Sequence, residues 1–520
     1  MHWPNSRIFY DILTQSASPG FEIHARALLE EAEHQLSLTN AQPDPLGHGH
    51  GQTHQQLVAR IAALKYALSP VRRLPADILL EIFQRVVPLN NSPRFPYWFS
   101  SPNTHFDCVL RLGSVCSYWR QLIITAPRLW PTSMSLNGYK PSSYVDITRR
   151  LLQHSNPHPV DITIVGCALR LSASLQSHVT FTAISMAHRW RRISVECDIV
   201  PFLKAVPSSG PLYHLTEIDL KGLRWNENDK PSAFFLNAPL LTHVKLETSH
   251  PVKLLLPWSQ LTKLELETVV GSSGFLTILE QCISMADLGL EDIICEEVGV
   301  SYASLQQPDM SLLDIVSLPH LRDLKVNMFD YGTFEPFFCH FRFPSLRKVV
   351  IQAMAGMGPD FDVSFLSFLQ RCFALEHLEI FGCDLNSTLL GEILLCIPSL
   401  TYLNLHCCFY GVDDTFFERL TYRATDLNPP APCLQRLRLE SVGPGDHFSE
   451  DVILAMVRSR WWTKDTFQAL PFPPHVARWQ YIHISADDSG LKAPLSDEFK
   501  TIVAEFRAEG LTCEVFRARQ

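Results

Sequence analysis

A six-residue pattern recurs along most of the chain and constrains its fold more than any other feature. The pattern is an apolar residue, two variable residues, an apolar residue, one variable residue and a final apolar residue, and apolar helical stretches lie between several copies. This alternation predicts a short strand with one buried face. Because one strand and one helix cannot bury their own apolar faces, successive copies are expected to stack as a solenoid. The clear copies are LTEIDL at 215, LTHVKL at 241, LTKLEL at 261, LRDLKV at 321, LRKVVI at 346, LEHLEI at 375, LTYLNL at 400 and LQRLRL at 434, and the weaker copies are WRRISV at 190 and MADLGL at 285.

The copies resemble leucine-rich repeats in pattern and spacing, since their starts lie 20 to 36 residues apart. The match is best in LEHLEIFGCDL, where Cys383 follows Leu375 by eight residues, and Cys408 follows Leu400 by the same interval. Leucine-rich repeats place Asn or Cys at this position, and we expect both thiols to satisfy inward backbone groups. Other copies have different residues there, which predicts irregular repeats. The predicted fold class is α/β, with a small α-helical module followed by an irregular leucine-rich repeat solenoid, its parallel strands on the concave face and its helices on the convex face.

The third, fifth and seventh positions of each repeat strand are expected to face the concave surface, because the apolar positions point inward. These positions carry mixed charge and a few aromatic rings, which suits a protein or peptide ligand better than a phosphate polymer. The alternative is that most of them are solvated strand faces without a ligand. The candidates for substrate binding are His243, Lys245, Lys263, Glu265, Lys325, His377, Glu379, Tyr402, Asn404, Arg436 and Arg438.

Ahead of the repeats, apolar residues at helical spacing predict several short amphipathic helices. The first spans about residues 57–68 and ends at Ser69-Pro70. The second spans residues 78–86, with Pro75 at its entrance. A third apolar stripe covers residues 110–123, and we expect two short helices there with a break near Gly113-Ser114.

The segments LPADILLEIFQRV and VLRLGSVCSYWRQLIITAPRLW resemble the F-box, and together with the preceding helix they look like the fungal F-box-like family. The resemblance implies docking onto a Skp-family adaptor and, through it, onto a cullin-based ubiquitin ligase core. This chain departs from the family in residues 88–106, a segment much longer than the usual connection between the first two helices. The adaptor-binding residues implied by the resemblance are Leu74, Pro75, Ile78, Leu79, Ile82, Phe83, Leu112, Val115, Cys116 and Trp119.

A short helical module cannot hide every apolar side chain internally, so surplus apolar side chains have to meet a partner. Leu74, Pro75, Ile78 and Leu79 are where we expect the adaptor contact. For four other residues two interpretations stay open, contact with the adaptor or closure of a small core against the repeats: Ile82, Phe83, Val115 and Trp119.

Composition narrows the classes of partner and compartment. The formal net charge is −9, with 53 acidic against 44 basic residues, so neither nucleic acid nor an anionic membrane is the expected partner. The N-terminal residues lack the basic flank and apolar run of a secretory signal. The 14 cysteines follow no regular framework and are expected to be reduced thiols. These features predict a cytoplasmic or nuclear protein.

The sequence also lacks the short motifs that mark common catalytic centres. It has no GxSxG, no GxxxxGK[ST], no HExxH and no paired CxxC. His48, His50 and His54 lie in a glycine-containing segment that is more typical of a solvated leader than of a metal site. We therefore expect no catalytic residue, no metal and no cofactor.

The sequence predicts three parts: a weakly ordered leader (1–52), an F-box-like helical domain with its preceding helix (53–136) and a repeat domain with a C-terminal cap (137–520). The predicted function is a non-catalytic substrate adaptor of a Skp-cullin-F-box ubiquitin ligase, in which the repeats bind a protein substrate. The alternatives are a repeat scaffold that assembles partners without a ligase, and an enzyme with an unrecognised site in the repeats.

Overall fold

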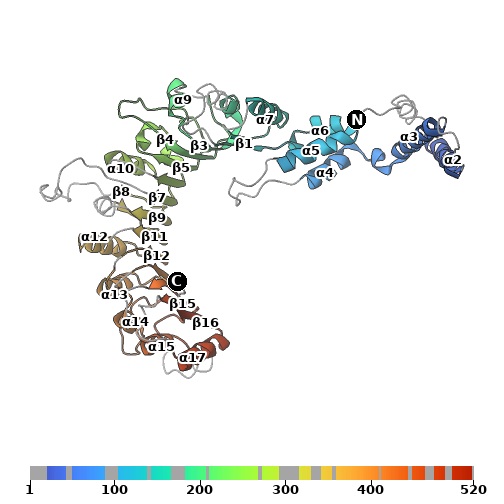
Figure 1. The fold of residues 1–520 in the computed structure, drawn as a ribbon. Coiled ribbons are helices and arrows are strands. Elements are labelled where there is room, and N and C mark those ends of the chain that lie inside the picture. The colour runs from blue at the N-terminus through green and yellow to red at the C-terminus, as the bar shows by residue number, and fades with distance from the viewer. Residues whose placement is uncertain are drawn as a thin grey trace. The chain divides into compact units, whose positions relative to one another are not determined.

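The chain divides into two compact units, Met1–Pro131 and Thr132–Gln520, and each is considered separately below (Figure 1). The computed structural model describes residues 20–41, 50–87, 103–137, 142–165, 182–206, 210–267, 272–291, 316–328, 341–353, 359–383, 385–408, 411–442, 448–462, 474–486 and 495–517. The long segment noted in the sequence, residues 88–106, falls mostly outside the described residues, as do residues 1–19 of the leader.

Two helices that pack on one another open the first unit, α2 (Phe21–Ala41) and α3 (His50–Leu68). Ala25 and Ala32 of α2 are fully buried, and they are seven residues apart, so they lie on one helix face two turns apart. Small side chains at this spacing let the helices approach closely, and Glu33 pairs with Lys65 across the contact at 2.7 Å. Residues 21–41 of the predicted leader therefore form a packed helix, which differs from the expectation of weak order.

The other described residues of this unit include three short helices, α4 (Ala76–Val86), α5 (Asn103–Val115) and α6 (Ser117–Ile124), with 3-10 turns at Pro70–Arg73 and Pro127–Leu129. The break between α5 and α6 falls at Cys116, two residues later than predicted. Cys116 is extended, with φ −159°, and its Sγ accepts a hydrogen bond from the backbone N–H of Trp119, so it caps α6. The indole of Trp130 donates to the carbonyl of Ile123 at 2.8 Å, which holds the end of the unit against α6.

Within the described residues, the second unit contains one parallel sheet of 14 strands whose order follows the chain, so each strand pairs with the strand of the preceding repeat (Figure 1). The prediction of an α/β fold built on stacked parallel strands is confirmed. The strands are β1 (Ser133–Asn137), β2 (Val160–Val165), β3 (Trp190–Glu196), β4 (Glu217–Leu223), β5 (His243–Thr248), β6 (Lys263–Glu267), β7 (Asp287–Glu291), β9 (Asp323–Met328), β11 (Lys348–Ala353), β12 (His377–Phe381), β13 (Tyr402–His406), β14 (Arg436–Val442), β15 (Tyr481–Ala486) and β16 (Thr512–Arg517).

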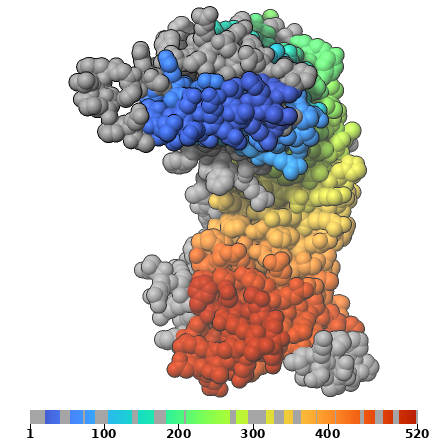
Figure 2. All heavy atoms as spheres, turned by 90° about the vertical axis from the view of Figure 1, so that its right-hand side faces the viewer, coloured from blue at the N-terminus to red at the C-terminus, as the bar shows by residue number. Residues whose placement is uncertain are grey.

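The helices of this unit follow one side of the sheet (Figure 1). A separate two-stranded pair, β8 (Val316–Ser317) and β10 (Phe341–Arg342), precedes β9 and β11 in the chain. In the space-filling view the colour changes in order along the stack, as expected when each repeat contacts mainly its neighbours (Figure 2). The helices are α7 (Ser142–His154), α9 (Val200–Ala205), α10 (Ser272–Gln281), α12 (Pro359–Gln370), α13 (Ser387–Cys396), α14 (Asp414–Leu420), α15 (Glu450–Ser459) and α17 (Asp497–Ala508).

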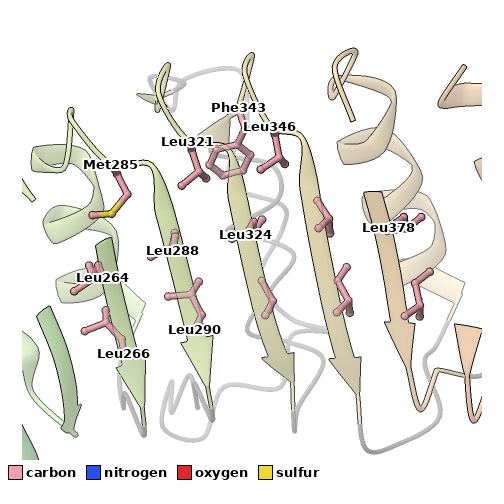
Figure 3. Packing of buried hydrophobic residues seen from close by; sticks show 14 of the residues in the cluster. Leu264, Leu266, Met285, Leu288, Leu290, Leu321, Leu324, Phe343, Leu346 and Leu378 are labelled. Carbon is pink, nitrogen blue, oxygen red and sulfur yellow. The ribbon is translucent and has the colours of Figure 1, made fainter. Parts of the chain in front are cut away.

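The apolar positions of the repeat form continuous rows across the strands (Figure 3). Leu264 pairs with Leu288, which pairs with Leu324, and all three side chains are buried. A buried leucine contributes about 1.5–3 kcal/mol relative to an exposed one. A slip of one residue in any strand would move the charged side chains into this core, so the apolar pattern also fixes the register.

The repeat unit begins earlier than predicted. β1 already pairs with β2 in parallel, and its register joins Ser133 to Asp161, so the first strand lies before the expected boundary at residue 137. The segment was missed because it contains only Met134 and Leu136 as alternating apolar residues. At the other end, the expected helix and strand are α17 and β16, and β16 pairs with β15 as the last strand of the sheet.

The two cysteines that follow β12 and β13 are buried, as expected from the repeat pattern. The thiol of Cys408 donates to the carbonyl oxygen of Ile380 at 3.4 Å, one strand away, and the thiol of Cys383 lies 3.5 Å from the carbonyl oxygen of Phe381. These weak hydrogen bonds satisfy inward carbonyls at the ends of the strands, so the prediction of a structural role for both thiols is confirmed.

Candidate binding surfaces

The helix α4 carries two apolar stripes side by side, one buried and one exposed. Leu79 and Phe83 have 0 % of their surface exposed, while Ile78 is 45 %, Ile82 41 % and Val86 55 % exposed. Residues four apart lie on one face of a helix, and the two sets are offset by one residue. The exposed stripe, Ile78, Ile82 and Val86, therefore adjoins the core of the first unit and faces solvent.

Leu79 is corrected from a predicted adaptor contact to a core residue of the helical unit, and Phe83, for which a core role had stayed open, is also buried. The ring of Phe83 packs edge-on against Trp119 of α6, with 4.7 Å between ring centroids, and this contact connects α4 to α6. Leu79 and Phe83 are four residues apart, so they lie on one face of α4, and this face packs against α6. Trp119 is accordingly half-buried by this packing.

The other predicted adaptor residues are more accessible. Pro75 and Val115 are exposed, and Leu74, Leu112 and Cys116 are intermediate. Altogether, seven large apolar or tyrosine side chains on α4, α5 and α6 are exposed: Ile78, Ile82, Val86, Leu110, Val115, Tyr118 and Ile124. Exposed apolar residues gathered in a small helical unit are typical of an interaction surface.

In the second unit, the third, fifth and seventh positions of the repeat strands form what we call the open face, the side of the sheet opposite its apolar rows. Pairing across the strands brings equivalent positions together, as in His243 beside Lys263 and Lys263 beside Asp287. The open face has two chemically different regions. The charged region comprises Arg192, Glu217, Lys245, Lys263, Glu265, Glu267, Asp287, Glu291 and Lys325, and the aromatic region comprises His377, Phe381, Tyr402, His406, Arg436, Tyr481, His483 and Phe516.

Side chains of the charged region form ion pairs with one another. The ammonium of Lys263 lies 2.9 Å from Glu265 and 3.2 Å from Asp287, and Lys245 bridges Glu265, at 3.3 Å, and Glu267. Burial opposes the charge of Lys245, but the two carboxylates outweigh it and raise its pKa. Lysines paired in this way are already neutralised, so little of their charge is available to bind a ligand.

The aromatic region contains stacked rings. His377 and Tyr402 stack with 4.1 Å between ring centroids, and Phe381 lies 5.6 Å from His406. The guanidinium of Arg436 lies over the ring of Tyr402 at 5.3 Å and over that of Tyr481 at 5.8 Å. Rings held in this manner are rigid, so they can contact a ligand at low entropic cost.

Glu379 accepts several hydrogen bonds beside the stacked rings of His377 and Tyr402. Its carboxylate accepts from Lys348 at 3.0 Å and Asn404 at 3.1 Å, and lies 2.8 Å from the ring of His377. Burial alone would raise the pKa of Glu379, but these hydrogen bonds lower it to about 2. Burial also lowers the pKa of His377, against the hydrogen bond to Glu379. Glu379 is thus ionised and compensated at neutral pH.

Asn404 was predicted to contact the substrate, and this prediction is wrong because only 3 % of its surface is exposed. It lies on the open face but is covered by its neighbours. Glu440 on the next strand is similarly engaged, with Arg438, with His406 at 3.2 Å and with His483 at 3.5 Å. The carboxylates of the aromatic region therefore have internal partners, and Tyr402 and Arg436 remain as the better candidates among the predicted residues.

The sequence analysis missed β15, which contributes Tyr481 and His483 to the aromatic region, whereas Phe516 lies on β16, the expected C-terminal strand. The segment WQYIHI, residues 479–484, does fit the repeat pattern when Trp is accepted at its first position. Trp479 is buried there, with the role that leucine has in the other copies. The copy was not recognised, although the copy WRRISV at 190 also begins with Trp.

No group of three or more His, Cys, Asp or Glu side chains in the described residues could hold a metal ion. Among the helices that the structure describes, none is both long enough and apolar enough to cross a membrane. No protein-family model matches the chain, and no curated protein matches it.

Proposed function

We propose that this protein is a non-catalytic substrate adaptor of a Skp-cullin-F-box ubiquitin ligase. In this proposal the surface of α4, α5 and α6 docks onto a Skp-family adaptor, and the open face of the repeats binds a protein substrate. The observation that carries it is the exposed stripe of Ile78, Ile82 and Val86 beside a buried stripe on the same helix. The mechanism needs no catalytic group, because tethering raises the effective concentration of the substrate near the ligase.

The energetics of the stripe suit a docking site. Covering an aliphatic side chain that is about half exposed removes apolar surface from water, at about 25 cal/mol per Å². Anchors at the centre of such an interface contribute about 1–4 kcal/mol each when truncated. Pro75 at the entrance of α4 extends the stripe by one turn, since it precedes Ile78 by three residues. The stripe thus offers a compact apolar contact on a preformed helix.

Replacing Ile78 and Ile82 by Asp tests the proposal by co-purification with a purified Skp-family adaptor. The double variant is expected to reduce adaptor binding at least about tenfold, because two carboxylates would be desolvated in an apolar contact. Both side chains are exposed, so the fold should persist, and circular dichroism melting checks this. Ile147→Asp is the matched control, since Ile147 is 52 % exposed on α7 of the other unit. Adaptor binding that is absent in the parent protein, or unchanged in the double variant, would overturn the proposal.

The second candidate is a repeat scaffold that assembles partners without a ligase. The burial of Leu79 and Phe83 favours it, since two of the residues matched to the F-box serve the core of the helical unit. Under this hypothesis the open face still binds a protein, but the exposed stripe has no Skp-family partner. The co-purification experiment distinguishes the two candidates.

A further inference from the structure

Arg436 differs from every other cation on the open face. Among the described residues, it is the one open-face cation with no carboxylate at ion-pair distance, although its side chain is exposed. The others each pair with an acid on their own or a neighbouring strand: Arg192 with Glu217, Lys221 with Glu196, Lys245 with Glu265, Lys263 with Asp287, Lys325 with Glu291, Lys348 with Glu379 and Arg438 with Glu440.

The row that contains Arg436 explains this difference. The pairing register places His377, Tyr402, Arg436, Tyr481 and Thr512 side by side on five strands, and none of the five is acidic. The rings of Tyr402 and Tyr481 hold the guanidinium by cation–π contact. This contact orients the group through its face and does not use its N–H donors. The guanidinium is therefore positioned in advance with donors that no carboxylate occupies.

A carboxylate is the chemical group that complements such a site. The planar fork of Arg matches a carboxylate with two parallel hydrogen bonds. The next row of the open face contains Glu379 and the row after it contains Glu440, and both are ionised and compensated by their own partners. A phosphate brings about twice the negative charge, so it meets more repulsion from these two acids than a single carboxylate does.

We propose that Arg436, held between Tyr402 and Tyr481, anchors one Asp or Glu side chain of a bound protein segment. The flanking rings would contact the residues next to that acid, because ring faces are accessible apolar surface beside the charge. This inference rests on the proposed function only in taking a protein as the ligand of the open face. It concerns a different unit from the adaptor surface, so the two proposals can fail independently.

Selection of short random peptides on the immobilised full-length protein provides the probe. We expect the selected peptides to share one acidic position, and replacing that acid by its amide should weaken binding at least about tenfold. Arg436→Gln should cause a similar loss, and the two changes together should cost no more than one alone, as expected for a direct pair. Arg436→Lys should retain part of the affinity, because it keeps the charge but loses the planar fork.

Arg192→Gln is the matched control, since it makes the same substitution at an exposed open-face side chain whose carboxylate partner, Glu217, lies in the charged region. It should change affinity less than about twofold. Melting temperatures of all variants establish that they are folded. Selected peptides without a shared acid, no selected peptide at all, or tighter binding when phosphoserine replaces the acid would each overturn the proposal. Loss of adaptor binding in a separate assay would leave it intact.

Discussion

The charged and aromatic regions of the open face share one backbone architecture and differ in what their side chains leave unused. In the charged region a cation such as Lys263 contacts two carboxylates, so a ligand would have to displace partners that are already present. In the aromatic region Arg436 is held by rings, which position the guanidinium without neutralising it. The comparison teaches that the number of charges on a face predicts binding less well than the number of charges without a partner.

The largest expected effect is a loss of stability at Arg460, a buried residue that packs on Trp479 just before β15. Arg460 is fully buried and donates to the carbonyls of Ala431 at 2.9 Å and Pro430 at 2.8 Å, and it lies over the ring of Trp479. Arg460→Met removes the guanidinium donor from both carbonyls, and that of Ala431 keeps the N–H of Leu434 as a second donor, so we expect a loss of about 2–4 kcal/mol in the free energy of unfolding. Chemical denaturation measures it. Arg458→Met, at an exposed position in the last turn of α15, which ends just before Arg460, should stay within about 0.5 kcal/mol of the parent.

Replacing Glu379 is expected to have an intermediate effect on the free energy of unfolding, and this effect should depend on pH. The pKa of Glu379 is lowered to about 2 in the folded chain, below its value in the unfolded chain. The stabilisation is therefore complete above the unfolded pKa and is lost as the pH falls toward 2. At pH 7, Glu379→Gln should cost about 1–2 kcal/mol after allowance for solvent screening. The difference between the two proteins should shrink when unfolding is measured at pH 3, and a constant difference would contradict this account.

The smallest effect is expected in the charged region. Arg192 and Glu217 pair at 3.0 Å, but about half of each side chain is exposed. Exposed pairs contribute about 0–1 kcal/mol and are screened by salt. Arg192→Gln should therefore change stability by less than about 0.5 kcal/mol, and the change should vanish in about 1 M NaCl. A loss equal to that of Glu379→Gln would erase the distinction between the two regions.

The sequence was sufficient to predict the parallel sheet because most strands repeat the same spacing of apolar residues. Leu264, Leu288 and Leu324 were recognisable one by one, and the requirement to bury them placed their strands side by side. The copy at β1 escaped because Met134 and Leu136 are its only alternating apolar residues, and the copy at Trp479 was not recognised although WRRISV at 190 also begins with Trp.

Side-chain partnership on the open face could not be predicted from the chain alone. Arg436 and Arg438 are two residues apart on one strand and look equivalent in sequence, yet Arg438 pairs with Glu440 and Arg436 does not. The difference depends on which residues the neighbouring strands place beside each position, and that follows from the register. The same holds for Asn404, whose burial is set by its neighbours across the sheet.

The adjacency of a buried and an exposed stripe on α4 links recognition to stability. A partner that covers Ile78 and Ile82 binds the helix whose other face holds Leu79 and Phe83, so it binds only the folded unit. Occupancy at a hundred times the dissociation constant would add about 2.7 kcal/mol to the stability of that unit. The lifetime of the helices in a cell would then follow the supply of their partner, and molecules left without one would be the first to unfold.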